Sequence, residues 1–281
     1  AALSLVLIAM FSVSTSPIIA RYLPHVPAIT ISFWRMCFGA IILWIFTIRK
    51  HQIPLKNKHL KLTIIAGIFL GIHFALFFQS IKLTTIANAT FLGTLTPLFT
   101  FLIEKIFLKK NHSKTLIFGL ILVILGIIII LGNKFDFSSK YTIGNLYALF
   151  CSLFLGISFI ISKQVRSSVT TISYTKSLFT SAAITLFIIA LITNTNLIQF
   201  SFYSYIGLLM LGIIPTILGH GSMYYALRYA SPTIVSATPM GEPIIASILA
   251  WYLFNEIIEI PILIGGLIIL FGLKFLTQEI K

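Results

Sequence analysis

Apolar runs of about 20 residues recur along the chain, and such a run spans the bilayer core of about 30 Å at about 1.5 Å rise per residue. The sequence predicts ten membrane-spanning helices, over residues 2–19, 30–48, 62–81, 87–103, 116–131, 143–161, 172–192, 203–225, 232–254 and 261–276. The connections are short and leave no room for a soluble catalytic domain or a nucleotide-binding module. We therefore expect an all-α integral membrane protein.

The composition agrees with a lipid environment. Hydrophobic residues make up 58% of the chain and charged residues 9%, whereas soluble domains carry roughly 25% charge. Lys and Arg outnumber Asp and Glu by 20 to 6, but they lie in connections between apolar runs and form no stripe that would bind nucleic acid. Cys37 and Cys151 lie inside apolar runs and form neither a metal motif nor a disulfide framework, so we interpret both as small core residues.

The basic residues also predict an orientation. With the N-terminus inside, the inner connections and ends hold 14 of the 20 Lys and Arg, the outer connections hold 4, and Arg35 and Lys176 lie within helices. Because inner loops are enriched in Lys and Arg, we expect both termini in the cytoplasm of a bacterial cell, with the helices in its inner membrane. The chain begins without Met or a basic leader, so we interpret its first apolar run as a helix and expect preceding residues to be missing.

An internal repeat relates the two halves. A shift of 146 residues places Lys82 on Arg228 and Pro97 on Pro243, with aromatic residues aligned before them. The repeats are residues 1–133 and 142–281, each with five spans. Because five is odd, the second repeat starts on the opposite membrane face and is inverted. Inverted repeats place a substrate site near the midplane, where exchange of their conformations gives alternating access.

Two stretches resemble the half-motifs of the EamA type of the drug/metabolite transporter superfamily. The first comprises Phe78-Gln79-Ser80-Ile81-Lys82, Thr84, Thr85, Ala87, Asn88 and Pro97, and the second Tyr224-Tyr225-Ala226-Leu227-Arg228-Tyr229-Ala230-Ser231, Glu242-Pro243 and Trp251-Tyr252-Leu253-Phe254-Asn255-Glu256. Arg35 falls where the family usually has an Arg in its second helix. The family usually closes its fourth helix with a Glu, and this chain has Lys110 there, while Glu256 keeps the counterpart in the second half.

The resemblance implies a secondary transporter rather than an enzyme, with no cofactor or metal, acting as a monomer or weak dimer. It implies alternating-access transport of a small polar or amphipathic metabolite, with amino acid efflux or exchange as the leading interpretation and a proton or counter-solute as a coupled partner. The Ile, Lys, Phe and Asn bias is typical of an AT-rich bacterial genome. If that cell depends on a host, nutrient uptake, for example of S-adenosylmethionine, is the alternative. An intramembrane enzyme and a channel are the rivals from other classes.

Glu242 is the one acid clearly inside a predicted span. It lies between Pro239 and Pro243, and each proline leaves the carbonyl four residues earlier without its helical donor, so we expect this helix to be kinked or loosened. Two roles remain open for the carboxylate. It binds a substrate amine or a proton, or it pairs with Arg35 or Lys176 and holds helices together.

Two histidines occupy nearly corresponding places in the halves, since His73 shifted by 146 falls one residue before His220. Imidazole titrates near neutral pH and suits proton coupling or polar contact. We add Phe77, Tyr224, Asn88 and Phe91 to the predicted substrate site, because aromatic and amide groups hold amines by cation–π contact and hydrogen bonds. Each of these residues can instead be an ordinary core residue of the bundle.

Glycines at close spacing predict tight helix contacts inside the bundle. Gly67 and Gly71 form a GxxxG pattern in the third predicted helix. The tenth predicted helix contains the small residues Gly265, Gly266 and Gly272. Small residues let helix backbones approach closely in membranes. A dimer contact is the alternative use of these faces.

The orientation can be measured by cysteine labelling. In a background with Cys37→Ala and Cys151→Ala, we expect a membrane-impermeant thiol reagent added outside intact cells to label Asn194→Cys and to spare Lys58→Cys. After the cells are opened, both variants should react. Labelling of Lys58→Cys alone from outside would reverse the predicted topology.

Overall fold

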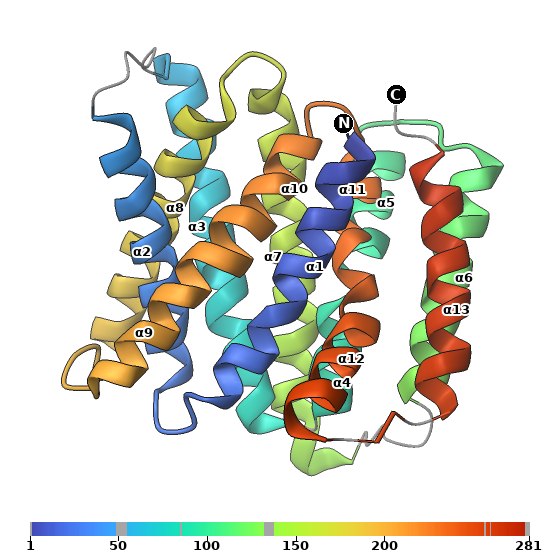
Figure 1. Ribbon diagram of the computed structural model, residues 1–281. Coiled ribbons are helices and arrows are strands. Elements are labelled where there is room, and N and C mark those ends of the chain that lie inside the picture. The colour runs from blue at the N-terminus through green and yellow to red at the C-terminus, as the bar shows by residue number, and fades with distance from the viewer. Residues whose placement is uncertain are drawn as a thin grey trace.

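The computed structural model describes residues 2–48, 55–84, 86–131, 138–255, 257–258 and 260–278. They form a bundle of long helices (Figure 1). In chain order the elements are α1 (Ala2–Arg21), α2 (Ala28–Thr47), α3 (Asn57–Leu83), α4 (Ile86–Gly93), α5 (Thr96–Ile106), α6 (Lys114–Leu131), η2 (Ser139–Tyr141), α7 (Thr142–Arg166), α8 (Thr171–Ile192), α9 (Phe202–Leu211), η3 (Gly212–His220), α10 (Gly221–Ala226), α11 (Pro232–Ser236), η4 (Thr238–Gly241), α12 (Glu242–Phe254) and α13 (Ile260–Thr277).

The architecture is that of a multi-pass membrane protein. Within the described residues, 7 helical stretches are long and apolar enough to cross a membrane. Two shorter apolar helices, Lys114–Ile130 and Ile260–Leu276, and the pair α4 and α5 occupy the other predicted spans. The part of the chain that the structure describes contains no strand. The all-α class is therefore confirmed, while the count of ten crossings stays a prediction.

The predicted span 87–103 is not the single helix that we expected. It divides into α4, which ends at Gly93, and α5, which begins at Thr96. Pro97 has no N–H to donate to the Gly93 carbonyl, and a proline also disfavours helical geometry in the residue before it. The span 232–254 divides in the same way into α11, η4 and α12, in agreement with the loosening expected around its prolines.

The predicted span 203–225 is continuous but irregular. Its central segment, η3, is a π-helix of 9 residues with Pro215 inside it. Such segments are rare and usually occur as single turns at functional sites. The sequence predicts an ordinary α-helix here. The winding differs because Pro215 cannot donate the backbone hydrogen bond that a regular α-helix requires.

The first long helices of the two predicted repeats run in opposite senses. In Figure 1, α1 starts at the upper end of the bundle beside the N label, whereas α7, the first long helix of the second half, starts at the lower end. An inverted repeat requires this arrangement. The exact pseudo-two-fold relation, with Pro97 and Pro243 at similar depths, stays a prediction.

Glycine positions bring several helix backbones together. A Cβ atom on Gly67 would lie 2.7 Å from the Leu178 carbonyl oxygen of α8, and one on Gly71 would lie 2.9 Å from the Ala182 oxygen. Between α6 and α13, a Cβ on Gly126 would lie 2.6 Å from the Gly265 oxygen. These faces are therefore used inside the bundle, as the sequence predicted.

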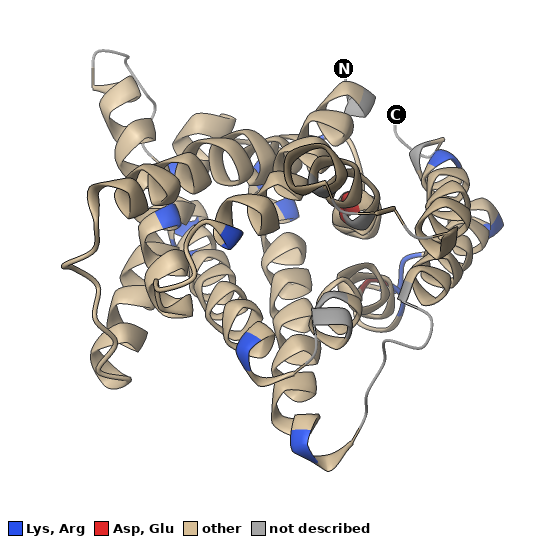
Figure 2. Cartoon of the chain, turned by 60° about the horizontal axis from the view of Figure 1, so that its bottom comes forward, with Lys and Arg blue, Asp and Glu red and all other residues tan. Residues whose placement is uncertain are grey.

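Charged residues are sparse along the helices (Figure 2). The acids of the described chain are Glu104, which is fully buried, and Glu242, which is half-buried, and both lie among the helices rather than on the lipid-facing outside. Asp136, Glu256, Glu259 and Glu279 lie outside the described residues. Buried carboxylates are costly in a membrane, so each of these two acids needs a physical explanation.

The contact between α3 and α8 can be tested by filling it. Gly67→Ala places a methyl group against backbone, and overpacking costs typically 1–3 kcal/mol, so we expect a lower melting temperature in detergent. Gly221→Ala is the matched control, because its Cβ would meet nothing nearer than 3.9 Å. Equal melting temperatures for the two variants would contradict close packing at Gly67.

Candidate functional site

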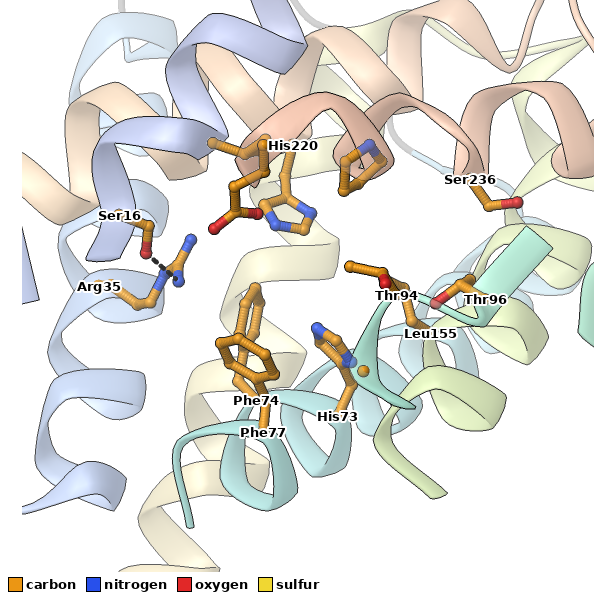
Figure 3. A pocket seen from close by; sticks show the side chains of 14 residues that line it. Ser16, Arg35, His73, Phe74, Phe77, Thr94, Thr96, Leu155, His220 and Ser236 are labelled. Carbon is orange, nitrogen blue, oxygen red and sulfur yellow. Dashed lines mark hydrogen bonds between the residues drawn. The ribbon is translucent and has the colours of Figure 1, made fainter. Parts of the chain in front are cut away.

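A central cavity lies where the helix breaks of both halves meet (Figure 3). Its volume is about 70 Å³. The first half contributes α1, α2, α3 and the break between α4 and α5, and the second half contributes α7, η3 and the segments from α11 to α12. The side chains and glycine that line it are Val13, Ser16, Arg35, His73, Phe74, Phe77, Gly93, Thr94, Thr96, Leu155, His220, Ser236, Pro239 and Glu242.

Arg35 brings a positive charge to the cavity from α2. It is 2% exposed. Its Nε donates to Thr216 Oγ1 at 3.1 Å, its Nη1 donates to Ser16 Oγ at 3.4 Å, and its Cζ lies 4.2 Å from the centre of the Phe74 ring. All three contacts are neutral, so they orient the guanidinium without cancelling its charge.

The position of Thr216 follows from the proline beside it. Pro215 cannot donate to the Leu211 carbonyl four residues earlier, and the Thr216 hydroxyl donates to that carbonyl at 2.8 Å. The same hydroxyl oxygen accepts from Arg35 Nε. The proline in η3 thus explains why an acceptor for the guanidinium lies at this depth.

Glu242 brings a negative charge from the other half. It is the first residue of α12, where the helix dipole favours a carboxylate. Glu242 and Arg35 line the same cavity, but no hydrogen bond or ion pair within 4.0 Å joins Glu242 to any other described residue. Two opposite charges therefore face one cavity without neutralising each other by contact.

The two histidines lie on either side of one aromatic ring. The centre of the Phe74 ring is 4.7 Å from that of His73 and 5.1 Å from that of His220. His73 Nδ1 is 2.8 Å from the Cys151 carbonyl oxygen, and because a carbonyl only accepts, this nitrogen carries the proton. Nε2 is then the acceptor of the neutral ring.

Two buried polar atoms at the cavity have no hydrogen-bond partner among the described residues. They are His220 Nδ1 and Thr96 Oγ1, in side chains that are 6% and 2% exposed. Buried polar atoms are nearly always hydrogen-bonded, because leaving one unpaired costs free energy. A polar molecule bound in the cavity would supply these missing bonds.

The structure gathers some of the predicted site residues and separates others. Arg35, His73, Phe77, His220, Pro239 and Glu242 line the cavity. Asn88, Phe91, Tyr224, Lys176 and Pro97 do not line it. Pro243 lies in α12, directly after Glu242.

The residues outside the cavity have other surroundings. Asn88 donates to Asn145 Oδ1 at 2.9 Å, and Phe91 packs against the hydrophobic core. Tyr224 is fully buried, and its hydroxyl is 3.2 Å from Ser158 Oγ. The Lys176 amine lies 4.1 Å from the Trp44 ring centre, between α2 and α8, so it is not the partner of Glu242 that the sequence analysis considered.

Several cavity residues were missed by the sequence analysis. Ser16, Phe74, Thr94 and Ser236 are small or apolar and occur in many membrane helices, so composition could not distinguish them. Ser16 precedes Pro17 inside α1, and a proline within a predicted span was the signal that could have drawn attention to it.

Glu104 is the other acid among the described helices; it is fully buried, and its contacts differ from those of Glu242. Its Oε1 is 2.8 Å from Lys110 Nζ, and its Oε2 accepts from Thr233 Oγ1 at 2.6 Å. The carboxylate therefore joins the end of α5 to the start of α11. This ion pair also explains how the chain accommodates Lys110, which departs from the family pattern.

Comparisons with known proteins agree with the architecture. Residues 1–132 and 142–278 match the model of the EamA-like transporter family. The pseudopaline exporter CntI of Pseudomonas aeruginosa PAO1 is 22% identical over 255 residues, which cover 91% of this chain and 88% of that protein. An uncharacterized transporter of Archaeoglobus fulgidus is 25% identical over 254 residues, covering 89% and 87%.

The crystal structure of another protein has the same fold. It superimposes with a TM-score of 0.83 at 16% identity and covers 99% of this chain and 96% of its own. At this identity the likeness concerns the fold alone.

The different surroundings of the two acids predict different responses to charge removal. Glu242→Gln should leave the melting temperature nearly unchanged, because Arg35 keeps its neutral contacts. Glu104→Gln should lower it by the equivalent of about 1–3 kcal/mol, since the ion pair is lost and the buried site must accept an amide. Both are measured by thermal unfolding in detergent. If Glu242→Gln is destabilised as much as Glu104→Gln, the Glu242 carboxylate is a structural partner of Arg35.

Proposed function

This chain belongs to the EamA-like transporter family, and on that premise we propose that it carries a small polar metabolite bearing an amine, such as an amino acid, through the central cavity. Its family and its transporter relatives make it a multi-pass membrane transporter rather than an enzyme. The observation that carries the proposal is the pair of opposite charges, Arg35 and Glu242, that face one cavity without an ion pair between them.

A zwitterion complements this arrangement. A substrate carboxylate would bind the Arg35 guanidinium, whose planar N–H groups match carboxylate geometry. A substrate ammonium would bind Glu242, and the rings of Phe74 and Phe77 offer cation–π surfaces beside it. His220 Nδ1 would gain a partner from the same ligand or from a bound water molecule.

The geometry supports alternating access. A pocket that encloses a metabolite has a volume of roughly 300–1,000 Å³, so the cavity of about 70 Å³ must widen before a substrate enters. The walls that must move come from both halves, and helix breaks supply places where segments can tilt separately. At the end where α11 begins, the Glu104–Thr233 contact holds the halves together and must separate for the cavity to open there.

The direction proposed for transport is efflux or exchange. It is supported by the relative that is named as an exporter. The titratable groups His73, His220 and Glu242 at the cavity would allow proton coupling. We further propose that the protein lies in the bacterial inner membrane with both termini in the cytoplasm, as the distribution of basic residues predicts.

Counterflow into proteoliposomes tests this function. Vesicles that contain the purified protein and an unlabelled amino acid mixture are placed in single labelled amino acids, with S-adenosylmethionine and decarboxylated amines as comparison solutes. We expect saturable entry of at least one amino acid, and an ionophore should change the rate if a proton is coupled. Glu242→Gln should lower counterflow at least tenfold, and Arg35→Gln should abolish the preference for the amino acid over its decarboxylated amine.

The controls separate transport from folding and from leakage. Lys82→Gln changes an exposed charge away from the cavity and should transport normally. Selective transport of S-adenosylmethionine would redirect the proposal to that substrate. Unsaturable flux would indicate a channel, and a Glu242→Gln variant with unchanged counterflow would remove the carboxylate from the transport site.

A further inference from the structure

An apolar groove lies on the outside of the bundle between α2 and α8. Phe33, Cys37 and Trp44 line it from α2, and Thr180, Ile184 and Phe187 line it from α8. Its volume is about 310 Å³. Trp44, Ile184 and Phe187 are 48%, 55% and 44% exposed, so the groove is open to the surrounding lipid.

The groove offers hydrocarbon surface and no free polar group. Its polar side chain, Thr180, accepts from Trp44 Nε1 at 3.0 Å and donates to the Lys176 carbonyl at 2.7 Å. Both its donor and an acceptor position are therefore occupied inside the protein. Such a surface binds a hydrocarbon chain rather than a polar solute.

The groove follows most of the length of α2. It extends from Phe33 to Trp44, which is about 16 Å at about 1.5 Å per residue. Because α2 covers Ala28–Thr47, Trp44 lies near one end of the span and Phe33 near the other, so the groove crosses the middle of the span. An acyl chain whose headgroup lies near Trp44 needs about 15 Å to reach the midplane of the bilayer core, and the groove is long enough to hold it.

Lys176 stands at one end of this groove, one helical turn before Thr180. Its amine lies 4.1 Å from the centre of the Trp44 ring and 3.4 Å from Thr47 Oγ1, to which it donates. No acid among the described residues forms an ion pair with it. A lysine inside a membrane-spanning helix needs a partner or an aqueous neighbour, and Trp is typical of the interface where headgroups begin.

We propose that the α2–α8 groove binds one acyl chain of an anionic phospholipid and that Lys176 binds its phosphate. The charge decides the occupant, because a second protein chain packed over the groove would bury an ammonium that no described acid pairs with. The Trp44 ring and the Thr47 hydroxyl orient the amine toward the headgroup. This site is separate from the central cavity, although α2 carries Arg35 two residues beyond Phe33.

Fluorescence quenching by brominated lipids tests the proposal. Trp34→Phe with Trp251→Phe leaves Trp44 as the sole tryptophan of the 3 in the chain. The protein is reconstituted into vesicles that contain an equal mole fraction of phosphatidylglycerol or phosphatidylcholine with bromine on the acyl chains. We expect Trp44 to prefer phosphatidylglycerol by about fivefold, the effect of one lysine near an anionic headgroup. Signals are normalised to vesicles without bromine.

Variants of the lysine decide whether it causes the preference. Lys176→Gln and Lys176→Met should quench equally in both lipids, whereas Lys176→Arg should keep the preference. Lys274→Gln is the matched control, since Lys274 also lies near an aromatic ring, with its amine 5.8 Å from the centre of Phe271, but away from the groove. Equal quenching in the parent protein, or a preference that survives in both neutral variants, overturns the proposal.

Discussion

A lipid bilayer offers no hydrogen bonds, so every backbone polar group inside it must find a partner within the protein. This constraint explains why the chain is helical almost throughout and why its interruptions meet at one place. The break after Gly93, the irregular segment η3 and the divided segment from α11 to α12 all contribute residues that line the cavity. Irregular backbone is tolerated there because protein groups surround it.

The same constraint explains how the cavity acquires its chemistry. Pro215 cannot donate to the Leu211 carbonyl, and the Thr216 hydroxyl donates to that carbonyl while its oxygen accepts from Arg35. The hydroxyl group that bonds to this carbonyl therefore also accepts a hydrogen bond from the buried guanidinium. Contacts with uncharged groups hold the Arg35 side chain in place. Its positive charge is not neutralised by them and can attract an anion.

The two acids that lie among the helices show how sequence position alone can mislead. Helical spans follow from apolar length, and residues such as Arg35, His73 and Glu242 were predicted because a polar group in an apolar run needs a reason. Glu104 was not predicted as a site residue, because it lies near the end of a predicted helix. Only the folded chain places it against Thr233, where it joins the halves, while Glu242 remains without a partner within 4.0 Å in the described chain.

By itself, the sequence determined the all-helical membrane class, the approximate spans and the transporter family, because these depend on local hydropathy and on motifs that are contiguous in the chain. Tertiary structure decided which polar residues share the cavity. A lysine and a tyrosine are residue types that often bind substrates. In the folded chain, however, Lys176 lies beside Trp44 and Tyr224 is buried in the core. Periodicity assigns a residue to a helix, but the rotation of each helix in the bundle is set by packing against its neighbours, and that packing is not local in sequence.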